Sequence, residues 1–283
     1  MTLPSTGFHY GVPFDTYRQW PAVNVSTLKP MRKTPLHCKW AMEHPRETDE
    51  MNVGSALHVA CFEPARFERE FFMGTREYDG RTKEGRAAEA QELEAAAGRT
   101  YIRKKKGDAI DCESVVGMQH SLWNYRPSKR FLQMPGQCEV SALWQDSETG
   151  LMCKARFDKL VPASRPFIIE LKSTRDGSPY AFNKDVHKLG YDMQAAFYCW
   201  GVKTITGDEP LHLFLGVENV GPYAPFWATL DDMALQVGAS DFRRCLDAYA
   251  QCVATDDWPG YGEEVRKISL PGYITREQET PFL

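Results

Sequence analysis

The chain has 283 residues and a formal net charge of −4, with 42% hydrophobic and 25% charged residues. These proportions belong to a folded globular protein and exclude a collagen-like, disulfide-stapled or intrinsically disordered chain. No run approaches the roughly 18 apolar residues of a membrane-spanning helix, and the N-terminal sequence lacks the basic start and apolar run of a signal peptide. We therefore expect a cytoplasmic protein without a membrane partner.

The eight cysteines are scattered, and none forms a C-x-x-C pair. In a chain without an export signal, reduced thiols that pack as small hydrophobic side chains are expected. The slightly acidic balance argues against a protein that coats nucleic acid through bulk charge, but it leaves room for a local basic groove.

The first half of the sequence favours helices. Residues 1–50 are rich in proline and predict an irregular extension with one short helix at 36–43. Further helices are expected at 52–62, 64–71, 84–97 and 108–125, with a loop over 73–83. We place a domain boundary after residue 50 and a single domain over 51–283.

The pattern changes after Pro135, where strands become the favoured elements. Strands are expected at 137–145, 151–161 and 167–172, with a turn over 146–150. They are followed by a helix at 191–200, strands at 211–217 and 223–229, a closing helix at 231–253 and a loop-like tail from Trp258. This order predicts an α/β (α+β) core behind a helical N-terminal region.

Asp158 and the triplet Glu170-Leu171-Lys172 are the sharpest chemical feature. Glu170 and Lys172 are two apart on a predicted strand, so their side chains emerge on one face. Asp158 joins them if the two strands are neighbours. Two carboxylates beside a lysine suit Mg²⁺-assisted phosphodiester hydrolysis, with the Leu171 carbonyl as a further oxygen ligand. Lys172 would orient the attacking water and offset charge on phosphorus.

Each part of this pattern is weak by itself. A Glu-x-Lys triplet occurs by chance about once in a chain of this size, and a salt bridge at a solvated strand end is the alternative interpretation. Three more features fit the same site, although each has an ordinary structural explanation: His58 four residues after Gly54 on a helix, Glu139 on the first hairpin strand, and Gln194-x-x-x-Tyr198 on one helix face.

In this order the residues resemble the RecB-like branch of the PD-(D/E)XK nuclease superfamily. The segments GSALHVACFEPARFEREF, KARFDKL, FIIELKSTRDGSPYAF and LGYDMQAAFYCWGV are most similar to phage and prophage exonucleases of the RecE type (exodeoxyribonuclease VIII-like). The similarity spans residues 52–253. It implies a restriction-endonuclease-like core, in which a central mixed sheet with its catalytic part at 137–172 is flanked by helices.

The resemblance also implies residue roles. Asp158 and Glu170 would bind the metal, together with the Leu171 carbonyl, and Lys172 would be the catalytic lysine. His58 would be a metal ligand or would tune the carboxylates, and Glu139 would be an accessory acidic ligand.

The same resemblance implies contacts with DNA. Gln194 and Tyr198 are expected to make them. From the sequence itself, Ser173, Thr174 and Arg175 directly follow the lysine and could contact a phosphate, and Arg66 and Arg76 belong to a basic stretch that is a candidate wall of a DNA passage. For Gln194 and Tyr198, holding Lys172 is the other possibility. Phe157 stands where the superfamily has its name-giving proline, a position that mainly shapes the strand.

For function, the resemblance implies a Mg²⁺-dependent exonuclease, with Mn²⁺ able to substitute. It would digest linear double-stranded DNA from 5′ ends and leave 3′ single strands for an annealing recombinase of the RecT or Bet type. Such enzymes form homo-oligomeric rings and belong to phages or prophages in bacterial cells. No Fe–S cluster is expected, because the C-terminal part offers only Cys245 and Cys252.

Other interpretations stay open. One is a RecB-like nuclease that cuts single-stranded or flapped DNA, and whether a blunt duplex is cleaved would discriminate it. Another is a DNA-binding module with an inactive core, against which the complete set of acidic positions and Lys172 counts. A third is a metabolic enzyme with a chance Glu-Leu-Lys, which would show no nuclease activity.

Overall fold

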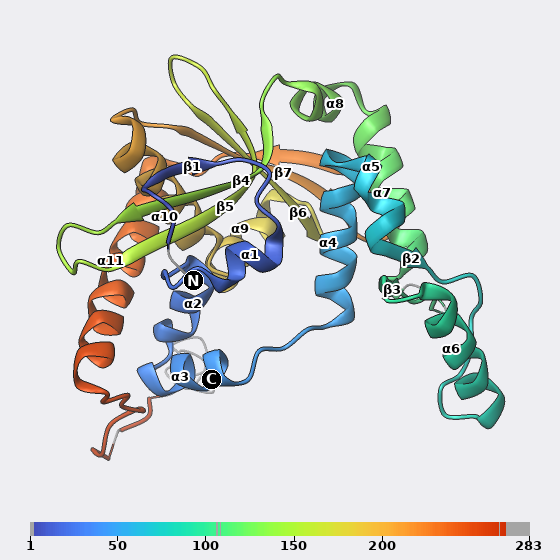
Figure 1. The fold of residues 1–283 in the computed structure, drawn as a ribbon, viewed down its shortest axis with the longest axis horizontal. Coiled ribbons are helices and arrows are strands. Elements are labelled where there is room, and N and C mark those ends of the chain that lie inside the picture. The colour runs from blue at the N-terminus through green and yellow to red at the C-terminus, as the bar shows by residue number, and fades with distance from the viewer. Residues whose placement is uncertain (1–2, 106, 108, 266, 270–283) are drawn as a thin grey trace, which may run out of the picture.

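A six-stranded mixed sheet forms the centre of the computed structural model, which describes residues 3–105, 107, 109–265 and 267–269 (Figure 1). The strand order is β1-β4-β5-β6-β7-β8. The strands are β1 (Gly7–His9), β4 (Gln137–Gln145), β5 (Met152–Val161), β6 (Phe167–Thr174), β7 (Leu211–Glu218) and β8 (Pro225–Ala228), while β2 (Phe71–Met73) and β3 (Thr100–Ile102) pair separately. The predicted α/β core with a central mixed sheet is confirmed.

Helices flank this sheet (Figure 1). They are α1 (Phe14–Gln19), α2 (Val25–Leu28), the 3₁₀ helix η1 (Lys29–Arg32), α3 (Pro35–Glu43), α4 (Asp49–Phe62), α5 (Pro64–Glu70), α6 (Lys83–Ala96), α7 (Cys112–Asn124), α8 (Arg126–Gln133), α9 (Pro179–Lys188), α10 (Tyr191–Thr206) and α11 (Asp232–Thr255). Within the described residues, no helix combines the length and apolar composition that crossing a membrane requires.

Strands β5 and β6 create the most important irregularity of the sheet. β4 pairs antiparallel with β5 along most of its length, and β6 pairs in parallel with β7 over eight successive positions. Between these two pairs, β5 and β6 share only three residue pairs, the last of which is Lys159–Ile169. Beyond that point the strands separate. Asp158 and Glu170 therefore lie where the gap begins.

Two buried cores hold helices against opposite faces of the sheet. On one face, α10 and α11 pack on β4 and β5 through residues that include Trp144 and Phe197, whose rings are 5.1 Å apart. On the other face, α4, α7 and α8 pack on β6 and β7 through residues that include Leu57 and Leu171. Helices α10 and α4 can therefore reach the gap from opposite sides.

Helix α10 is closely packed against α11. Gly190 precedes α10 with φ 66°, and Gly207 follows it with φ 84°. Both residues have a left-handed backbone, which favours glycine. Gly238 of α11 lies against the first turn of α10, so closely that a Cβ atom on it would be 2.2 Å from the carbonyl oxygen of Asp192. The position of α10 thus depends on a residue without a side chain.

The N-terminal extension is more regular than its sequence predicts. Strand β1 pairs with the edge of β4, and Asn24 caps α2 by accepting the N–H of Thr27 at 2.9 Å. Leu28 is fully buried in the core below α10 and α11. The expectation of an irregular segment is therefore wrong for much of residues 3–43. Contacts with the sheet and helices hold these short elements, and local periodicity does not reveal such contacts.

A buried lysine fastens the end of α1. The ammonium of Lys154 on β5 donates to the carbonyls of Tyr17, Arg18 and Trp20 at 2.8–3.0 Å. These carbonyls lie at the end of α1, where no further helical turn supplies N–H donors. Residues before position 50 are thus built into the same core as the sheet, while the domain boundary placed there stays a prediction.

Most predicted elements are confirmed with shifted ends. The helix expected at 52–62 begins at Asp49, because Thr48 caps it. The helix expected at 191–200 continues to Thr206. The helix expected from residue 108 begins only at Cys112, because Asp111 and Ser114 form a capping box there.

Four elements outside the extension were not expected from the sequence. Helix α9 begins with Ser178 as its cap and Pro179 in its first turn, a signal hidden in the loop-like stretch after Lys172. Strands β2 and β3 are three residues long and pair in parallel, and α8 follows α7 directly. All eight cysteines are free, and all except Cys138 are buried, as expected for reduced core residues. Residues 270–283 of the predicted domain lie outside the described residues.

Asp146→Asn is predicted to destabilise the protein in a pH-dependent manner. The buried Asp146 carboxylate accepts two hydrogen bonds of 2.9 Å from Arg243 of α11 and one of 3.0 Å from the Thr149 N–H. Burial would raise the pKa of this carboxyl, but these partners outweigh burial and hold the pKa at about 2. Asparagine keeps an acceptor for the turn and loses the ion pair. The free energy of unfolding should fall by about 2 kcal/mol at neutral pH.

The sign of the pH dependence follows from the lowered pKa of Asp146. Stability from this carboxylate is fully present above the unfolded value of 3.8 and is lost as the pH falls towards 2. Urea unfolding across this range should show the two proteins converging. Asp247→Asn is the matched control, because Asp247 pairs with the same Arg243 at the exposed surface and should contribute less than about 1 kcal/mol. A constant difference between wild type and Asp146→Asn at all pH values would contradict the prediction.

Candidate metal centre and active site

The carboxylates of Asp158 and Glu170 replace the missing ladder hydrogen bonds where β5 and β6 separate. Asp158 Oδ2 accepts the backbone N–H of Leu171 at 2.8 Å, and Glu170 Oε1 accepts the backbone N–H of Asp158 at 3.3 Å. Two backbone donors are satisfied in this way by side chains of the facing strand. The exchange fixes both carboxylates in the gap, where Asp158 is 9% and Glu170 1% exposed.

Glu170 also binds the predicted catalytic lysine. Its Oε2 accepts from Lys172 Nζ at 3.2 Å and from Gln194 Nε2 of α10 at 3.0 Å. The Lys172 ammonium lies 5.2 Å from the ring centre of Tyr191, at the start of α10. The two side chains that were expected on one face of the strand are therefore in direct contact, and α10 supports them from behind.

His58 of α4 approaches the gap from the opposite side. Its Nδ1 lies 3.2 Å from Asp158 Oδ1, and its Nε2 lies 3.0 Å from the Leu171 carbonyl oxygen. Both neighbours are hydrogen-bond acceptors, so without a cation they favour a doubly protonated imidazole, which must release a proton before one of its nitrogens can bind a metal ion. Burial opposes this charge, but Asp158 outweighs burial and raises the pKa of His58.

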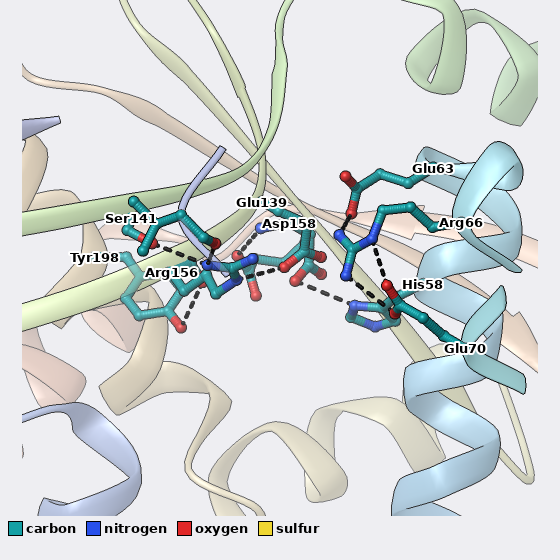
Figure 2. A network of polar contacts seen from close by, with 11 residues as sticks. His58, Glu63, Arg66, Glu70, Glu139, Ser141, Arg156, Asp158 and Tyr198 are labelled. Carbon is teal, nitrogen blue, oxygen red and sulfur yellow. Dashed lines mark hydrogen bonds and ion pairs between the residues drawn. The ribbon is translucent and has the colours of Figure 1, made fainter. Parts of the chain in front are cut away.

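Glu139 has a strained backbone beside Asp158. Its φ of 53° lies in the left-handed region, which is costly for a residue other than glycine and is a feature of functional sites. Arg156 Nε donates to the Glu139 carboxylate at 2.6 Å, and Arg156 Nη1 donates to the Val12 carbonyl and Ser141 Oγ (Figure 2). The N-terminal segment thus helps to hold Arg156, which orients Glu139.

Three of these side chains could bind a metal ion. One ligand atom each from His58, Glu139 and Asp158 lies within 4.8 Å of the others. Two carboxylates, one imidazole and the Leu171 carbonyl beside them form an oxygen-rich donor set that suits Mg²⁺ or Mn²⁺. The residues present therefore fit a divalent cation. Glu170, which was also predicted as a ligand, is not part of this group; its oxygens accept from Lys172, Gln194 and a backbone N–H, and its role as a metal ligand stays a prediction.

Burial and the proximity of the carboxylates shift their pKa values in the gap. Burial and the neighbouring Asp158 raise the pKa of Glu170 to about 7, and the same two causes raise the pKa of Glu139. For Asp158, burial favours the neutral acid, but His58 and Lys172 outweigh it and lower the pKa. Carboxylates that raise each other's pKa would be relieved by a divalent cation.

The other predicted contacts lie around this centre. Gln194 and Tyr198 are both 8% exposed, and the Tyr198 hydroxyl donates to the Arg156 carbonyl at 3.2 Å. They hold Glu170 and β5, and their contact with DNA stays a prediction. Thr174 is buried and donates to Asp185, whereas Ser173 is half-buried and Arg175 is exposed at the end of β6.

Acidic neighbours neutralise the predicted basic wall. Arg66 of α5 pairs with Glu63 and Glu70 beside the site (Figure 2). Arg76 lies with the distant α6, where its guanidinium donates to Gln91 and approaches Glu92 at 3.7 Å. The structure thus brings Arg66 close to the metal ligands and leaves Arg76 apart from them. The role of both in binding DNA stays a prediction.

Sequence reasoning missed three residues of the site: Arg156, Tyr191 and Lys29. Arg156 and Tyr191 stand inside segments that carry the resemblance, two residues before Asp158 and three before Gln194, so their spacing could have drawn attention to them. Lys29 had no such signal. It lies in the proline-rich extension and reaches Gln194 only through the tertiary fold.

A split sheet with paired carboxylates, and a lysine two residues after the second, define a PD-(D/E)XK-type nuclease fold and site. The chain belongs to the family described as "PDDEXK-like domain of unknown function", whose profile matches residues 24–271. This membership confirms the resemblance at the level of the superfamily.

A solved structure has a similar fold. A crystal structure from Eubacterium rectale, of a protein provisionally named an exonuclease, is similar with a TM-score of 0.56 and 14% identity, covering 96% of this chain and 99% of that chain. At this identity the likeness shows the fold alone. The structure of a protein named SSO0001 covers 78% of this chain and 85% of its own at 16% identity, and its TM-score of 0.28 carries no argument. No curated protein sequence matches the chain.

Proposed function

We propose that this protein is a divalent-metal-dependent nuclease and, more narrowly, a Mg²⁺-dependent exonuclease that hydrolyses linear double-stranded DNA. The observation that carries the proposal is the gap between β5 and β6. There His58, Glu139 and Asp158 offer a metal site, and Lys172 stands beside Glu170. A salt bridge on a solvated strand end does not explain this arrangement, because Glu170 is 1% exposed.

The residues of the gap have different roles in the proposed reaction. Asp158, Glu139, His58 and the Leu171 carbonyl would hold the cation, with Glu170 as a further ligand, and the cation would supply Lewis-acid chemistry by offsetting negative charge as the phosphodiester reacts. Burial disfavours the Lys172 ammonium, but Glu170 and Asp158 outweigh burial and raise its pKa, so it stays charged. It can donate to a phosphate oxygen and orient a water molecule for in-line attack.

The resemblance to RecE-type exonucleases supports a finer proposal. Digestion begins at 5′ ends and leaves 3′ single strands, and a RecT- or Bet-like annealing protein uses them for recombination. Several copies form a ring around the DNA, in the cytoplasm of a bacterial cell that carries the phage or prophage. Mn²⁺ substitutes for Mg²⁺, because both accept the oxygen-rich donor set.

End-labelled DNA tests this proposal. A linear duplex labelled separately at its 5′ and 3′ ends should lose the 5′ label first in Mg²⁺, whereas EDTA should stop the loss and closed circular DNA should stay intact. Lys172→Ala should lower the rate by at least about a thousandfold, because it removes the charged donor beside Glu170. Lys188→Ala, at an exposed lysine of α9, is the control and should leave the rate unchanged.

Other outcomes would redirect or overturn the proposal. Cutting of single strands alone would replace the duplex exonuclease with a single-strand nuclease. Loss of the 3′ label first would reverse the polarity. If a folded, metal-bound protein cuts none of these substrates, the nuclease function is wrong and a DNA-binding module remains.

A further inference from the structure

Lys29 brings a second lysine from the N-terminal extension to the active site. It begins η1 directly after α2, whose cap at Asn24 and buried Leu28 fix the backbone against α10 and α11. The stem of Lys29 crosses Gly190, where a Cβ would lie 3.2 Å from Lys29 Cε. A rigid element and a glycine therefore aim this side chain at the start of α10.

The ammonium of Lys29 ends beside the groups that hold Lys172. Its Nζ is 3.5 Å from Gln194 Oε1, and the other end of the same amide donates to Glu170. Lys29 and Lys172 share one aromatic neighbour, because their Nζ atoms lie 5.4 Å and 5.2 Å from the centre of the Tyr191 ring. Two cations thus face the same side of the site.

No carboxylate within the described residues forms an ion pair with Lys29, whereas Lys172 has Glu170 at 3.2 Å. The pKa of Lys29 falls to about 8, chiefly through burial and then through repulsion from Lys172. A largely buried ammonium without an anion is costly unless a ligand supplies the missing charge. In a nuclease, the anion that enters beside the catalytic lysine is a phosphate of the substrate.

We propose that Lys29 binds a DNA phosphate next to the scissile one, so that the N-terminal extension supplies a substrate contact beside Lys172. This inference rests on the proposed nuclease function and adds a residue to it. Both ammonium groups lie beside the Tyr191 ring, and each could bind one of two neighbouring phosphates on the same strand.

Binding of a linear duplex tests the role of Lys29. Lys29→Met keeps the apolar stem and removes the charge, Lys29→Arg keeps the charge, and Lys33→Met is the control at an exposed lysine just after η1. Binding is measured over a series of salt concentrations in Ca²⁺ instead of Mg²⁺, under conditions where no cleavage occurs. Lys29→Met should weaken binding about tenfold and reduce the slope of log K against log salt by about one. Lys29→Arg and Lys33→Met should keep the wild-type slope.

Kinetics and stability separate a substrate contact from a structural role. In Mg²⁺, Lys29→Met should raise KM more than it lowers kcat. Its melting temperature should be no lower than that of the wild type, because removing a partly buried charge that has no carboxylate partner removes a cost to folding. An unchanged salt slope for Lys29→Met would overturn the inference. A lower melting temperature that accompanies weaker binding would also overturn it, because it would indicate a structural role.

Two further comparisons complete the test. Duplexes with a 5′-phosphate or a 5′-hydroxyl distinguish the two sources of the phosphate. If Lys29 binds an internal phosphate, Lys29→Met weakens the binding of both duplexes equally. If it binds the terminal phosphate, the effect of Lys29→Met disappears with the 5′-hydroxyl duplex. The wild-type protein tests the proposed function separately. If it neither binds nor cuts DNA, the nuclease function fails, whereas normal activity with a normal Lys29→Met variant rejects this inference alone.

Discussion

Asp158→Asn is expected to lower the rate of DNA cleavage by at least about a thousandfold while leaving the protein folded. The amide oxygen of asparagine can still accept the Leu171 N–H, so the joint between β5 and β6 is kept. The variant loses the negative charge that pairs with His58 and that belongs to the three possible metal ligands. We expect the loss in binding of Mg²⁺ and Mn²⁺, measured by calorimetry, to accompany the loss of cleavage.

Glu63→Gln is the matched control for this variant. Glu63 is another carboxylate close to the site, but it pairs with Arg66 and lies outside the group of possible metal ligands (Figure 2). Its replacement should leave metal affinity and cleavage close to those of the wild type. If Asp158→Asn binds metal normally and cleaves DNA, then the cation is held elsewhere and our assignment of the centre is wrong.

Gly238→Ala is expected to cause the largest loss of stability, about 3 kcal/mol, although it adds only one methyl group. The new Cβ would lie 2.2 Å from the Asp192 carbonyl oxygen and 2.5 Å from its carbonyl carbon. These are backbone atoms, so no side-chain rotation can relieve the overlap, and α10 and α11 must move apart. Urea unfolding measures the loss. Cleavage should fall as well, because α10 carries Gln194.

Gly54→Ala makes the same substitution with the opposite expected sign. Gly54 lies inside α4, and a Cβ there meets no atom within 4 Å. Alanine should stabilise this helix by up to about 1 kcal/mol, because it restricts the unfolded chain and adds no overlap. A similar loss of stability in both variants would mean that close packing at Gly238 is not the cause.

The sequence predicts those parts of the site that depend on local pattern. Glu170 and Lys172 share a strand face because of their spacing, and they are found in contact. The turn at 146–150 predicts a hairpin that carries Glu139 and Asp158, but that Asp158 lies beside Glu170 was only a condition of the prediction, which the pairing of β5 with β6 fulfils. The helix with His58 was predicted from its sequence, although it begins three residues earlier than expected. Local hydrophobic pattern and turn residues were enough for these inferences.

The rest depends on geometry that residue spacing does not encode. Nothing in the sequence indicates that β5 and β6 pair over three positions and then separate, which turns two carboxylates into acceptors for backbone donors. The left-handed backbone of Glu139 is equally invisible, because glutamate seldom adopts it. The extension looked irregular because its elements are short and are stabilised by contacts with distant residues such as Lys154.

The separation in sequence between contacting residues has a consequence for how activity arises during folding. Asp158 and Glu170, whose hydrogen bond joins the gap, are 12 positions apart, whereas Lys29 and Gln194 are 165 apart. Closing the longer loop costs more entropy and belongs to the slower stage of folding. The metal ligands also depend on distant contacts, because His58 and Leu171 are 113 positions apart and Arg156, which orients Glu139, contacts Val12 across 144 positions. We therefore expect the complete site to form only when the N-terminal elements pack against the sheet.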